Sequence, residues 1–320
     1  MAKVKVGVIG LGFGSQVQVP CFQEHPDTEV VAVCASRLAR AQEVARQHGV
    51  PHAFDDYREV VRLPDLDVVS VAAPPYLHHP MALAALAAGK HVLCEKPFAL
   101  SVKEAREMVA AAREAGRVAM VNHEFRHLPA RAYAHELVRQ GYLGTLLTVH
   151  MSLFMGGPGD PAARPFGWLY QEERGGGFLG ALGSHFIDAV RFLTGDEFAG
   201  VVGRLETVVQ QRKDPATGEL RAVTADDTFT CAFRLRGGTP GALVGCYNVR
   251  FGPGSRIELY GTQGTLVMAT RVLNHEPVLL GGRAGDEGLQ ELPIPPRLVP
   301  FEEGDDVRDL PFKALVTRLA

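Results

Sequence analysis

The sequence predicts a chain of the α/β fold class, with a doubly wound parallel sheet followed by an α+β domain that holds a large, open, mainly antiparallel sheet. Up to about residue 122, β-branched runs alternate with helix-like segments, and such βαβ units form parallel sheets. Five long β runs separated by glycine turns come later, which favours antiparallel pairing: 200–211, 226–236, 241–250, 255–260 and 264–268. We therefore expect domains at 1–122 and 123–320.

The individual elements follow from local patterns. Strands are expected at 3–9, 29–34, 67–72, 91–94 and 118–121, with helices at 38–48, 81–88 and 102–114. Gly49 follows the first of these helices, as glycine at a C-terminal cap does. Ser101 and Glu104 have capping-box spacing before the third helix. After residue 122 we expect a helix at 129–140, a strand at 146–153 and a helix entered through three glycines at 175–177.

Composition excludes several function classes. The chain has 320 residues, which is above the size at which single cores stop growing, so two domains are the default. A net charge of -3 without a basic block argues against nucleic acid as a partner. No apolar run reaches the roughly 18 residues of a membrane span, and the N-terminus does not resemble a secretory signal, so we expect a cytoplasmic protein.

Metal and disulfide chemistry are also not expected. The five cysteines are far apart and form no C-x-x-C pair, so they are interpreted as small buried residues in a reducing compartment. His78 and His79 are adjacent, and neighbouring side chains on a strand or turn point apart, so we expect no metal there.

The segment Gly10-Leu11-Gly12-Phe13-Gly14-Ser15 directly follows the first strand. In a Rossmann dinucleotide-binding turn, the first glycine permits the tight turn and the second lets the backbone approach a pyrophosphate. The third place needs only a small residue, and Ser15 supplies it. The helix after the turn would offer its N–H groups to the phosphates.

The residues at the end of the second strand indicate whether the chain binds NAD(H) or NADP(H). NAD enzymes usually place an acid there for the ribose hydroxyls, but this chain has Ser36 and Arg37. A hydroxyl followed by a guanidinium suits a 2′-phosphate, because arginine offers a planar, permanently charged fork. We therefore favour NADP(H) over NAD(H). The alternative is that Arg37 merely begins an exposed helix.

The segment Glu95-Lys96-Pro97 ends the expected strand 91–94, at the edge where open α/β sheets bind ligands. Taken alone, a surface lysine before a proline would be the simpler interpretation.

Together these motifs resemble the Gfo/Idh/MocA family of NAD(P)-dependent oxidoreductases. Further matching segments are 73–78, 89–97, 126–129, 175–177, 183–188 and 260–265, in family order over about 260 residues. The resemblance implies a hydride transfer between a nicotinamide cofactor and a sugar, cyclitol or related diol. It also implies a homodimer or homotetramer formed through the C-terminal sheet, and a further helix and strand beyond residue 320.

The resemblance also assigns roles to residues of this chain. Lys96 would polarise or deprotonate the reacting hydroxyl, and His185 would donate and accept the proton. Pro74, Pro75, His78, Glu95 and Asn122 would contact the cofactor. Arg126 would contact substrate or a cofactor phosphate, with an ion pair between domains as its alternative, and Trp168 is either a wall of the substrate cleft or a core aromatic.

One position departs from the family pattern. Ala181 stands where relatives with a Lys–Asp–His set carry the aspartate, four residues before His185. Asp188 could reach back to His185 in its place. The departure leaves two alternatives to a dehydrogenase: a non-catalytic nucleotide-binding regulator or assembly subunit of the same fold, and a cofactor-dependent glycosidase.

Overall fold

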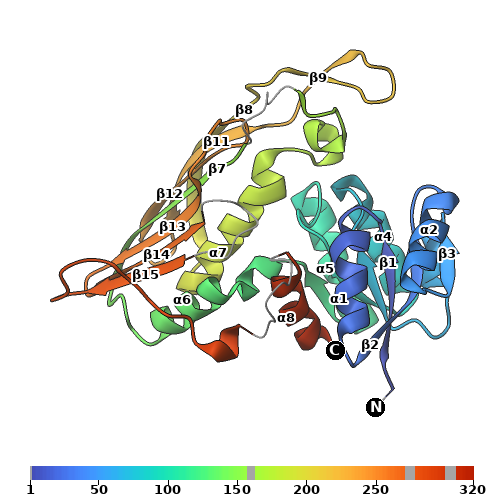
Figure 1. The fold of residues 1–320 in the computed structure, drawn as a ribbon, viewed down its shortest axis with the longest axis horizontal. Coiled ribbons are helices and arrows are strands. Elements are labelled where there is room, and N and C mark those ends of the chain that lie inside the picture. The colour runs from blue at the N-terminus through green and yellow to red at the C-terminus, as the bar shows by residue number, and fades with distance from the viewer. Residues whose placement is uncertain (1, 157–162, 271–277, 300–307) are drawn as a thin grey trace. The chain divides into compact units, whose positions relative to one another are not determined.

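The computed structural model describes residues 2–156, 163–270, 278–299 and 308–320, and it divides into two compact units (Figure 1). The first unit contains the residues up to Glu124, Glu173–Gly175 and Phe312–Ala320, and the second contains the rest. The sequence placed the last segment in the second domain. It joins the first unit because the fully buried Phe312 packs edge-on against Phe22, with ring centroids 5.3 Å apart.

The first unit is built on a six-stranded parallel sheet in the order β3-β2-β1-β4-β5-β6, which confirms the doubly wound prediction. Its strands are β1 (Val4–Ile9), β2 (Thr28–Cys34), β3 (His52–Phe54), β4 (Val68–Val71), β5 (His91–Cys94) and β6 (Ala119–Val121). The order changes direction between β1 and β4. The carboxyl ends of these two strands therefore form the switch point at which such sheets bind ligands.

Helices cover both faces of this sheet. One face carries α1 (Val19–Glu24), α2 (Leu38–His48) and α8 (Asp309–Leu319), and the other carries α3 (Tyr57–Val61), α4 (His78–Ala87) and α5 (Val102–Ala115). Two hydrophobic clusters result, because successive strand residues point to opposite faces. Val8 belongs to the first cluster and its neighbour Ile9 to the second.

The helix ends follow the sequence signals. α2 ends at Gly49, whose φ of 65° lies in the left-handed region. At the start of α5, the Ser101 hydroxyl accepts a hydrogen bond from the Glu104 N–H at 3.2 Å. The Glu104 carboxylate accepts one from the Leu100 N–H at 2.9 Å, so the capping prediction is confirmed.

The second unit contains an eight-stranded sheet in the order β16-β15-β14-β13-β7-β12-β11-β8 and a separate β10-β9 hairpin. The strands are β7 (Leu146–Phe154), β8 (Phe198–Glu206), β9 (Gln211–Lys213), β10 (Leu220–Ala222), β11 (Thr228–Leu235), β12 (Pro240–Cys246), β13 (Gly254–Gly261), β14 (Gly264–Thr270), β15 (Val278–Arg283) and β16 (Gln290–Glu291). Every pair in the large sheet is antiparallel except β12 and β7, which are parallel.

One face of this sheet packs against α6 (Pro129–Arg139) and α7 (Ser184–Thr194) (Figure 1). Short helical turns complete the fold: the π-helical η1 (Gly14–Gln18) and η7 (Leu179–Gly183), and the 3-10 turns η2 (Pro75–Leu77), η3 (Glu124–His127), η5 (Trp168–Tyr170), η6 (Glu172–Arg174) and η8 (Pro296–Leu298). Among the described residues, we find no helix with the length and apolar character needed to cross a membrane.

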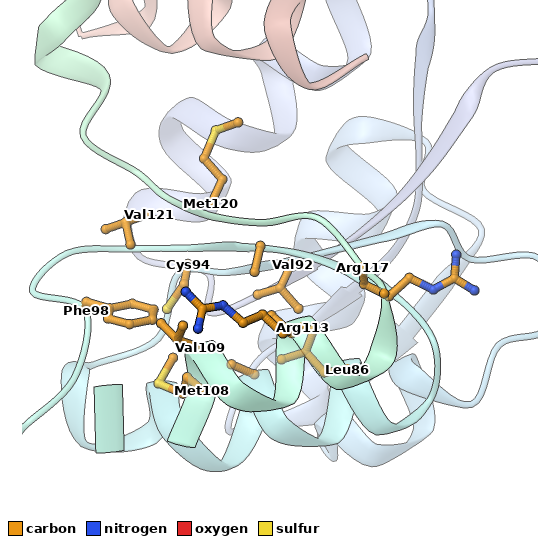
Figure 2. Close-up of a pocket in the computed structure, with 14 residues that line it drawn as sticks. Leu86, Val92, Cys94, Phe98, Met108, Val109, Arg113, Arg117, Met120 and Val121 are labelled. Atoms are coloured by element: carbon orange, nitrogen blue, oxygen red, sulfur yellow. The ribbon is translucent and has the colours of Figure 1, made fainter. Parts of the chain in front are cut away.

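An apolar pocket of about 410 Å³ lies within the first unit, between α4, α5 and the strands β5 and β6. Figure 2 shows Met108 and Val109 of α5 facing Val92 and Cys94 of β5, with the Arg113 side chain lying across them. Ala119, on the edge strand β6, lines the same pocket. This part of the hydrophobic layer is therefore incompletely filled.

Filling this pocket is expected to stabilise the protein. Ala119→Ile adds apolar volume to the pocket and a β-branched side chain to an edge strand, so we expect a gain of about 1 kcal/mol. A gain of that size corresponds to a rise in Tm of roughly 2–4 °C. Thermal denaturation of Ala119→Ile beside Val118→Ile tests this, because both positions are exposed and Val118 does not line the pocket. An unchanged or lower Tm for Ala119→Ile would show that the pocket does not accept the side chain.

Candidate active site

The glycine turn after β1 is built so that its first position can only be glycine. Gly10 has a φ of +99°, and a Cβ built on it would lie 2.4 Å from the carbonyl carbon and oxygen of Ala72, after β4. The Gly10 N–H donates a hydrogen bond to the Cys34 carbonyl at 2.9 Å, at the end of β2. The turn therefore contacts both strands that flank β1: β2 through this hydrogen bond, and the residue after β4 through the close approach of Gly10 to Ala72.

The second and third small positions differ in their surroundings. A Cβ built on Gly12 meets no described atom within 4 Å, so the backbone there is open to an approaching group. A Cβ on Gly14 would lie 3.0 Å from Cγ1 of Val8, which shows close helix–strand packing. The Ser15 hydroxyl donates to the Leu11 carbonyl at 2.9 Å. An open backbone before a helix N-terminus fits a pyrophosphate.

Arginines gather next to this turn. Arg37 is the exposed residue immediately before α2, and it follows Ser36 as the sequence analysis described. Arg40, which the sequence analysis missed, lies one turn further along α2. Its Nη2 atom is 3.4 Å from the Ser15 hydroxyl, and its Nη1 atom donates to Glu43 at 2.8 Å. The spacing of three from Arg37 is the signal that could have found it.

Acidic residues also approach the end of β2, and the sequence analysis did not anticipate them. β3 pairs with β2, and the Ala35 N–H donates to the Phe54 carbonyl at 3.2 Å. Asp55 and Asp56 come directly after Phe54. Burial, and then the charges of Asp56 and Asp55, raise the pKa of the Cys34 thiol to about 12. Cys34 is therefore an inert buried thiol, as expected, and carboxylates lie close to it.

Glu95, Lys96 and Pro97 follow β5, at the same edge of the sheet as the glycine turn. The Glu95 side chain is buried, and its Oε1 atom accepts hydrogen bonds from Nε2 of Gln18 at 2.9 Å and from Nδ2 of Asn122 at 2.5 Å. Its Oε2 atom accepts from the Lys96 N–H at 3.3 Å. Lys96 is half-buried, and its peptide bond to Pro97 is cis. A fixed carboxylate thus holds the Lys96 backbone.

Pro74, Pro75 and His78 form the turn after β4 and the start of α4. Pro75 is buried and opens η2. The His78 ring is fully buried, with Nε2 2.7 Å from the Ala73 carbonyl oxygen and Nδ1 3.0 Å from the Pro97 carbonyl oxygen. His78 therefore links the turns after β4 and β5. The expected contact of these residues with the cofactor stays a prediction.

The buried His78 makes stability depend on pH. Burial lowers the pKa of its imidazole from 6.5, so below that pH the unfolded chain binds a proton that the folded chain does not. Stability is therefore present above about pH 6.5 and is lost on acidification, by at most about 1.4 kcal/mol per pH unit for one proton. Denaturant unfolding at pH 5.5–7.5 should show a shallower dependence in His78→Gln. Equal slopes in both proteins would contradict this.

In the second unit, His185 lies on the first turn of α7 and is 1% exposed. Its ring stacks on Phe125, with centroids 3.9 Å apart and planes 16° from parallel. Arg131 lies over the Phe125 ring and donates to the His185 carbonyl at 3.4 Å. Ala181 lies in the π-helical η7, and its N–H donates to the Gly177 carbonyl at 3.0 Å. The imidazole is thus held by stacking.

Asp188 pairs with Arg126. The Arg126 Nε and Nη2 atoms donate to the two Asp188 carboxylate oxygens at 2.7 and 2.5 Å, and the guanidinium lies over the Phe192 ring. Both oxygens are therefore engaged by Arg126, which gives Asp188 a role other than orienting His185. The pair lies wholly within the second unit, so it is not the ion pair between domains that was the alternative for Arg126.

Trp168 is half-buried in η5, and part of the loop before it, 157–162, lies outside the described residues. Two residues on, the Tyr170 ring stacks under the guanidinium of Arg212, whose carbon is 4.1 Å from the ring centroid. Arg212 is fully buried and donates to the Asn248 side chain at 3.3 Å. No local pattern identifies this cluster, because its members come from segments far apart in the sequence.

Comparison with known proteins identifies both halves of the chain. A family model described as "Oxidoreductase family, NAD-binding Rossmann fold" matches residues 4–123, and the "GFO/IDH/MocA C-terminal domain" matches residues 131–267. An uncharacterized oxidoreductase of Synechocystis is 35% identical over 303 residues, covering 92% of this chain and 79% of the relative.

Two further similarities involve one named enzyme. Levoglucosan dehydrogenase of Pseudarthrobacter phenanthrenivorans is 32% identical over 292 residues, covering 83% of this chain and 74% of that protein. A solved structure of a levoglucosan dehydrogenase in complex with NADH and L-sorbose superposes with a TM-score of 0.82 at 27% identity, covering 91% of this chain and 80% of that one.

Proposed function

The chain belongs to the Gfo/Idh/MocA family of NAD-binding oxidoreductases, and on this premise we propose that it transfers a hydride between a nicotinamide dinucleotide and a sugar, cyclitol or related diol. The observation that carries the proposal is the meeting of two segments at one edge of the parallel sheet. The open glycine turn follows β1, and the buried Glu95 carboxylate beside Lys96 follows β5. Relatives named for sugar and dihydrodiol chemistry support the substrate class.

The proposed roles follow from what the side chains can do. A nicotinamide dinucleotide, when bound, supplies the hydride acceptor or donor. The Lys96 amine takes or returns the proton of the reacting hydroxyl, since an amine on a backbone held by the Glu95 carboxylate can act as a positioned acid–base group. His185 is the second proton-transfer group, and Arg126 and Trp168 are proposed to contact the substrate. The open backbone at Gly12 accommodates the phosphates.

For the cofactor, we propose a preference for NADP(H). Arg37 immediately precedes α2 and Arg40 lies on its first turn, next to the position of an adenosine ribose in such folds, and guanidinium groups bind phosphate in bidentate fashion. Asp55 and Asp56 favour the second candidate, NAD(H), because carboxylates repel a 2′-phosphate.

Steady-state kinetics with both dinucleotides decide between them. We expect kcat/KM to be about 10-fold or more higher with NADP(H), and Arg37→Ala to remove most of that difference, because one charge-assisted pair contributes about 1.5–3 kcal/mol. Arg46→Ala, on the exposed last turn of α2, is the control. A higher kcat/KM with NAD(H) in the wild-type protein would favour the NAD(H) assignment, whereas an unchanged ratio in Arg37→Ala would show that Arg37 does not contact the 2′-phosphate.

Catalysis itself is tested by absorbance at the nicotinamide band with a panel of sugars, cyclitols and diols. Turnover with any of them supports the dehydrogenase. If calorimetry shows dinucleotide binding but no compound of the panel is turned over, the result would instead support the non-catalytic regulator or assembly subunit, the alternative that Ala181 suggests. Release of nitrophenol from a glycoside by protein that retains its cofactor would support the glycosidase.

Assembly and location remain proposals. We propose a homodimer or homotetramer through the face of the large sheet opposite α6 and α7. That face carries polar side chains: Arg256 and Tyr260 both donate to Glu258, at 2.6 and 3.0 Å. Light scattering of the wild type and Tyr260→Asp tests this, with a monomeric wild type as the contrary result.

The cytoplasmic location is likewise a proposal, to be tested by cell fractionation.

A further inference from the structure

A buried chain of hydrogen bonds connects the glycine turn to the Lys96 segment. The Ser70 hydroxyl on β4 donates to Oε1 of Gln18 at 2.7 Å, and Nε2 of Gln18 donates to the Glu95 carboxylate at 2.9 Å. Asn122, after β6, donates to the same carboxylate oxygen at 2.5 Å. Ser70, Gln18 and Asn122 are 0% exposed, so none of these groups can exchange its partner for bulk water.

The orientation of the Gln18 amide is fixed from both sides. Ser70 supplies a hydroxyl proton to the amide oxygen, which leaves the NH₂ group to face Glu95. A flipped amide would place its oxygen against the carboxylate and lose that hydrogen bond, which is costly for buried groups, whereas the Ser70 hydroxyl can donate or accept. The acceptor-only Glu95 carboxylate therefore determines that Gln18 presents its NH₂ group, and Ser70 satisfies the amide oxygen.

Gln18 also belongs to the segment that would bind the phosphates. It is the last residue of η1, the π-helical turn that starts at Gly14 and continues into α1. π-turns of this kind interrupt helices mostly at functional positions. A displacement of the glycine turn therefore carries the Gln18 side chain with it, and the Glu95 carboxylate is bonded to that side chain.

The Glu95 carboxylate in turn constrains its neighbour. Its Oε2 atom accepts the Lys96 N–H, while the Glu95 N–H donates to the Val71 carbonyl at 2.9 Å, so the segment is held by side chain and backbone together. Without a donor at Gln18, the Oε1 atom of Glu95 would keep the hydrogen bond from Asn122 but lose the one from Gln18.

We propose that Gln18, whose amide oxygen is satisfied by Ser70, is a positioning residue: it fixes the Glu95 carboxylate and, through it, the Lys96 segment, and so couples the dinucleotide turn to the proton-transfer group. The inference rests on the proposed function for its catalytic consequence. The predicted signature is a loss in kcat without a matching loss in dinucleotide affinity, because the Gln18 side chain is 0% exposed and its amide bonds to Ser70 and Glu95.

The test compares Gln18→Met, which keeps the length but removes the donor, with Gln18→Glu, which places a second carboxylate against Glu95. We expect Gln18→Met to lower kcat about 10-fold or more, with the dissociation constant for NADPH from calorimetry changing less than 3-fold. Gln18→Glu needs a proton shared between the two carboxylates, so its kcat should fall further as pH rises from 6 to 9. Gln23→Met is the control, since this exposed amide of α1 donates to the His48 carbonyl instead.

A second readout does not depend on turnover. If Gln18 and Glu95 act as one unit, Tm losses in Gln18→Met and Glu95→Gln will not add in the double variant, which will lose less than the sum. Additive losses, or a kcat equal to wild type in both Gln18 variants, overturn the inference. An inactive wild type that still shows non-additive losses overturns the proposed function and leaves the Gln18–Glu95 coupling in place.

Discussion

Lys96→Ala is expected to lower kcat by about 10²–10⁴-fold, the range for removing a positioned acid–base group. Lys96 is half-buried after β5, and the Glu95 carboxylate accepts a hydrogen bond from its backbone N–H. Removing the side chain leaves the glycine turn intact, so the dissociation constant for the dinucleotide should change by less than about 3-fold. Stopped-flow absorbance at the nicotinamide band, with calorimetry for binding, measures both quantities.

Two controls make this result specific. Lys103→Ala removes a lysine that is exposed on α5 and is expected to leave kcat unchanged. Lys96→Arg keeps the charge but replaces the amine with a guanidinium that stays protonated, so it should remain impaired. If Lys96→Ala retains wild-type kcat, Lys96 does not carry the proton transfer and the assignment of this segment as the reaction centre is wrong.

The second large effect is expected from the glycine turn. Gly10→Ala puts a Cβ 2.4 Å from the Ala72 backbone at a φ of +99°, so we expect a loss of about 3–5 kcal/mol, at the upper end for single substitutions. Gly12→Ala meets no described atom within 4 Å, so the protein without its cofactor should keep its stability. Its added methyl occupies the proposed phosphate position, and dinucleotide affinity should fall about 10–100-fold.

The pair of variants separates folding from binding. Denaturant unfolding should distinguish Gly10→Ala from wild type and leave Gly12→Ala unchanged, whereas calorimetry with NADPH should detect Gly12→Ala. Wild-type affinity in Gly12→Ala would show that the phosphates bind elsewhere. Wild-type stability in Gly10→Ala would show that the turn relaxes away from Ala72.

Sequence patterns predicted those elements whose signals are local. The helix 38–48 was placed at the observed bounds because Gly49 marks its end, and β5 was placed correctly because a short apolar run is followed by Glu95. β3 was missed because three residues show no periodicity, and its consequence, the approach of Asp55 and Asp56 to β2, was missed with it. The parallel pairing of β12 with β7 was also missed, since local turn signals say nothing about partners some 90 residues away.

The site was predicted where a motif is contiguous and missed where it is assembled in space. The glycine turn and Glu95-Lys96-Pro97 are recognisable in the sequence because the residues of each motif are consecutive. Gln18 and Ser70 could not be found in this way, because their hydrogen bonds span 77 and 52 residues and any polar residue looks the same before its partner is known. Asp188 was considered for His185, but helical spacing could not reveal that Arg126 engages both of its oxygens.

The return of α8 to the first unit has a consequence for synthesis on the ribosome. Phe312, Leu315 and Val316 belong to the same hydrophobic cluster as Phe22, although they lie 290 or more positions further along the chain. The nascent N-terminal unit therefore exposes an uncovered apolar surface until the segment Asp309–Leu319 has left the exit tunnel. During that interval, holding chaperones have a binding surface that the finished protein no longer offers.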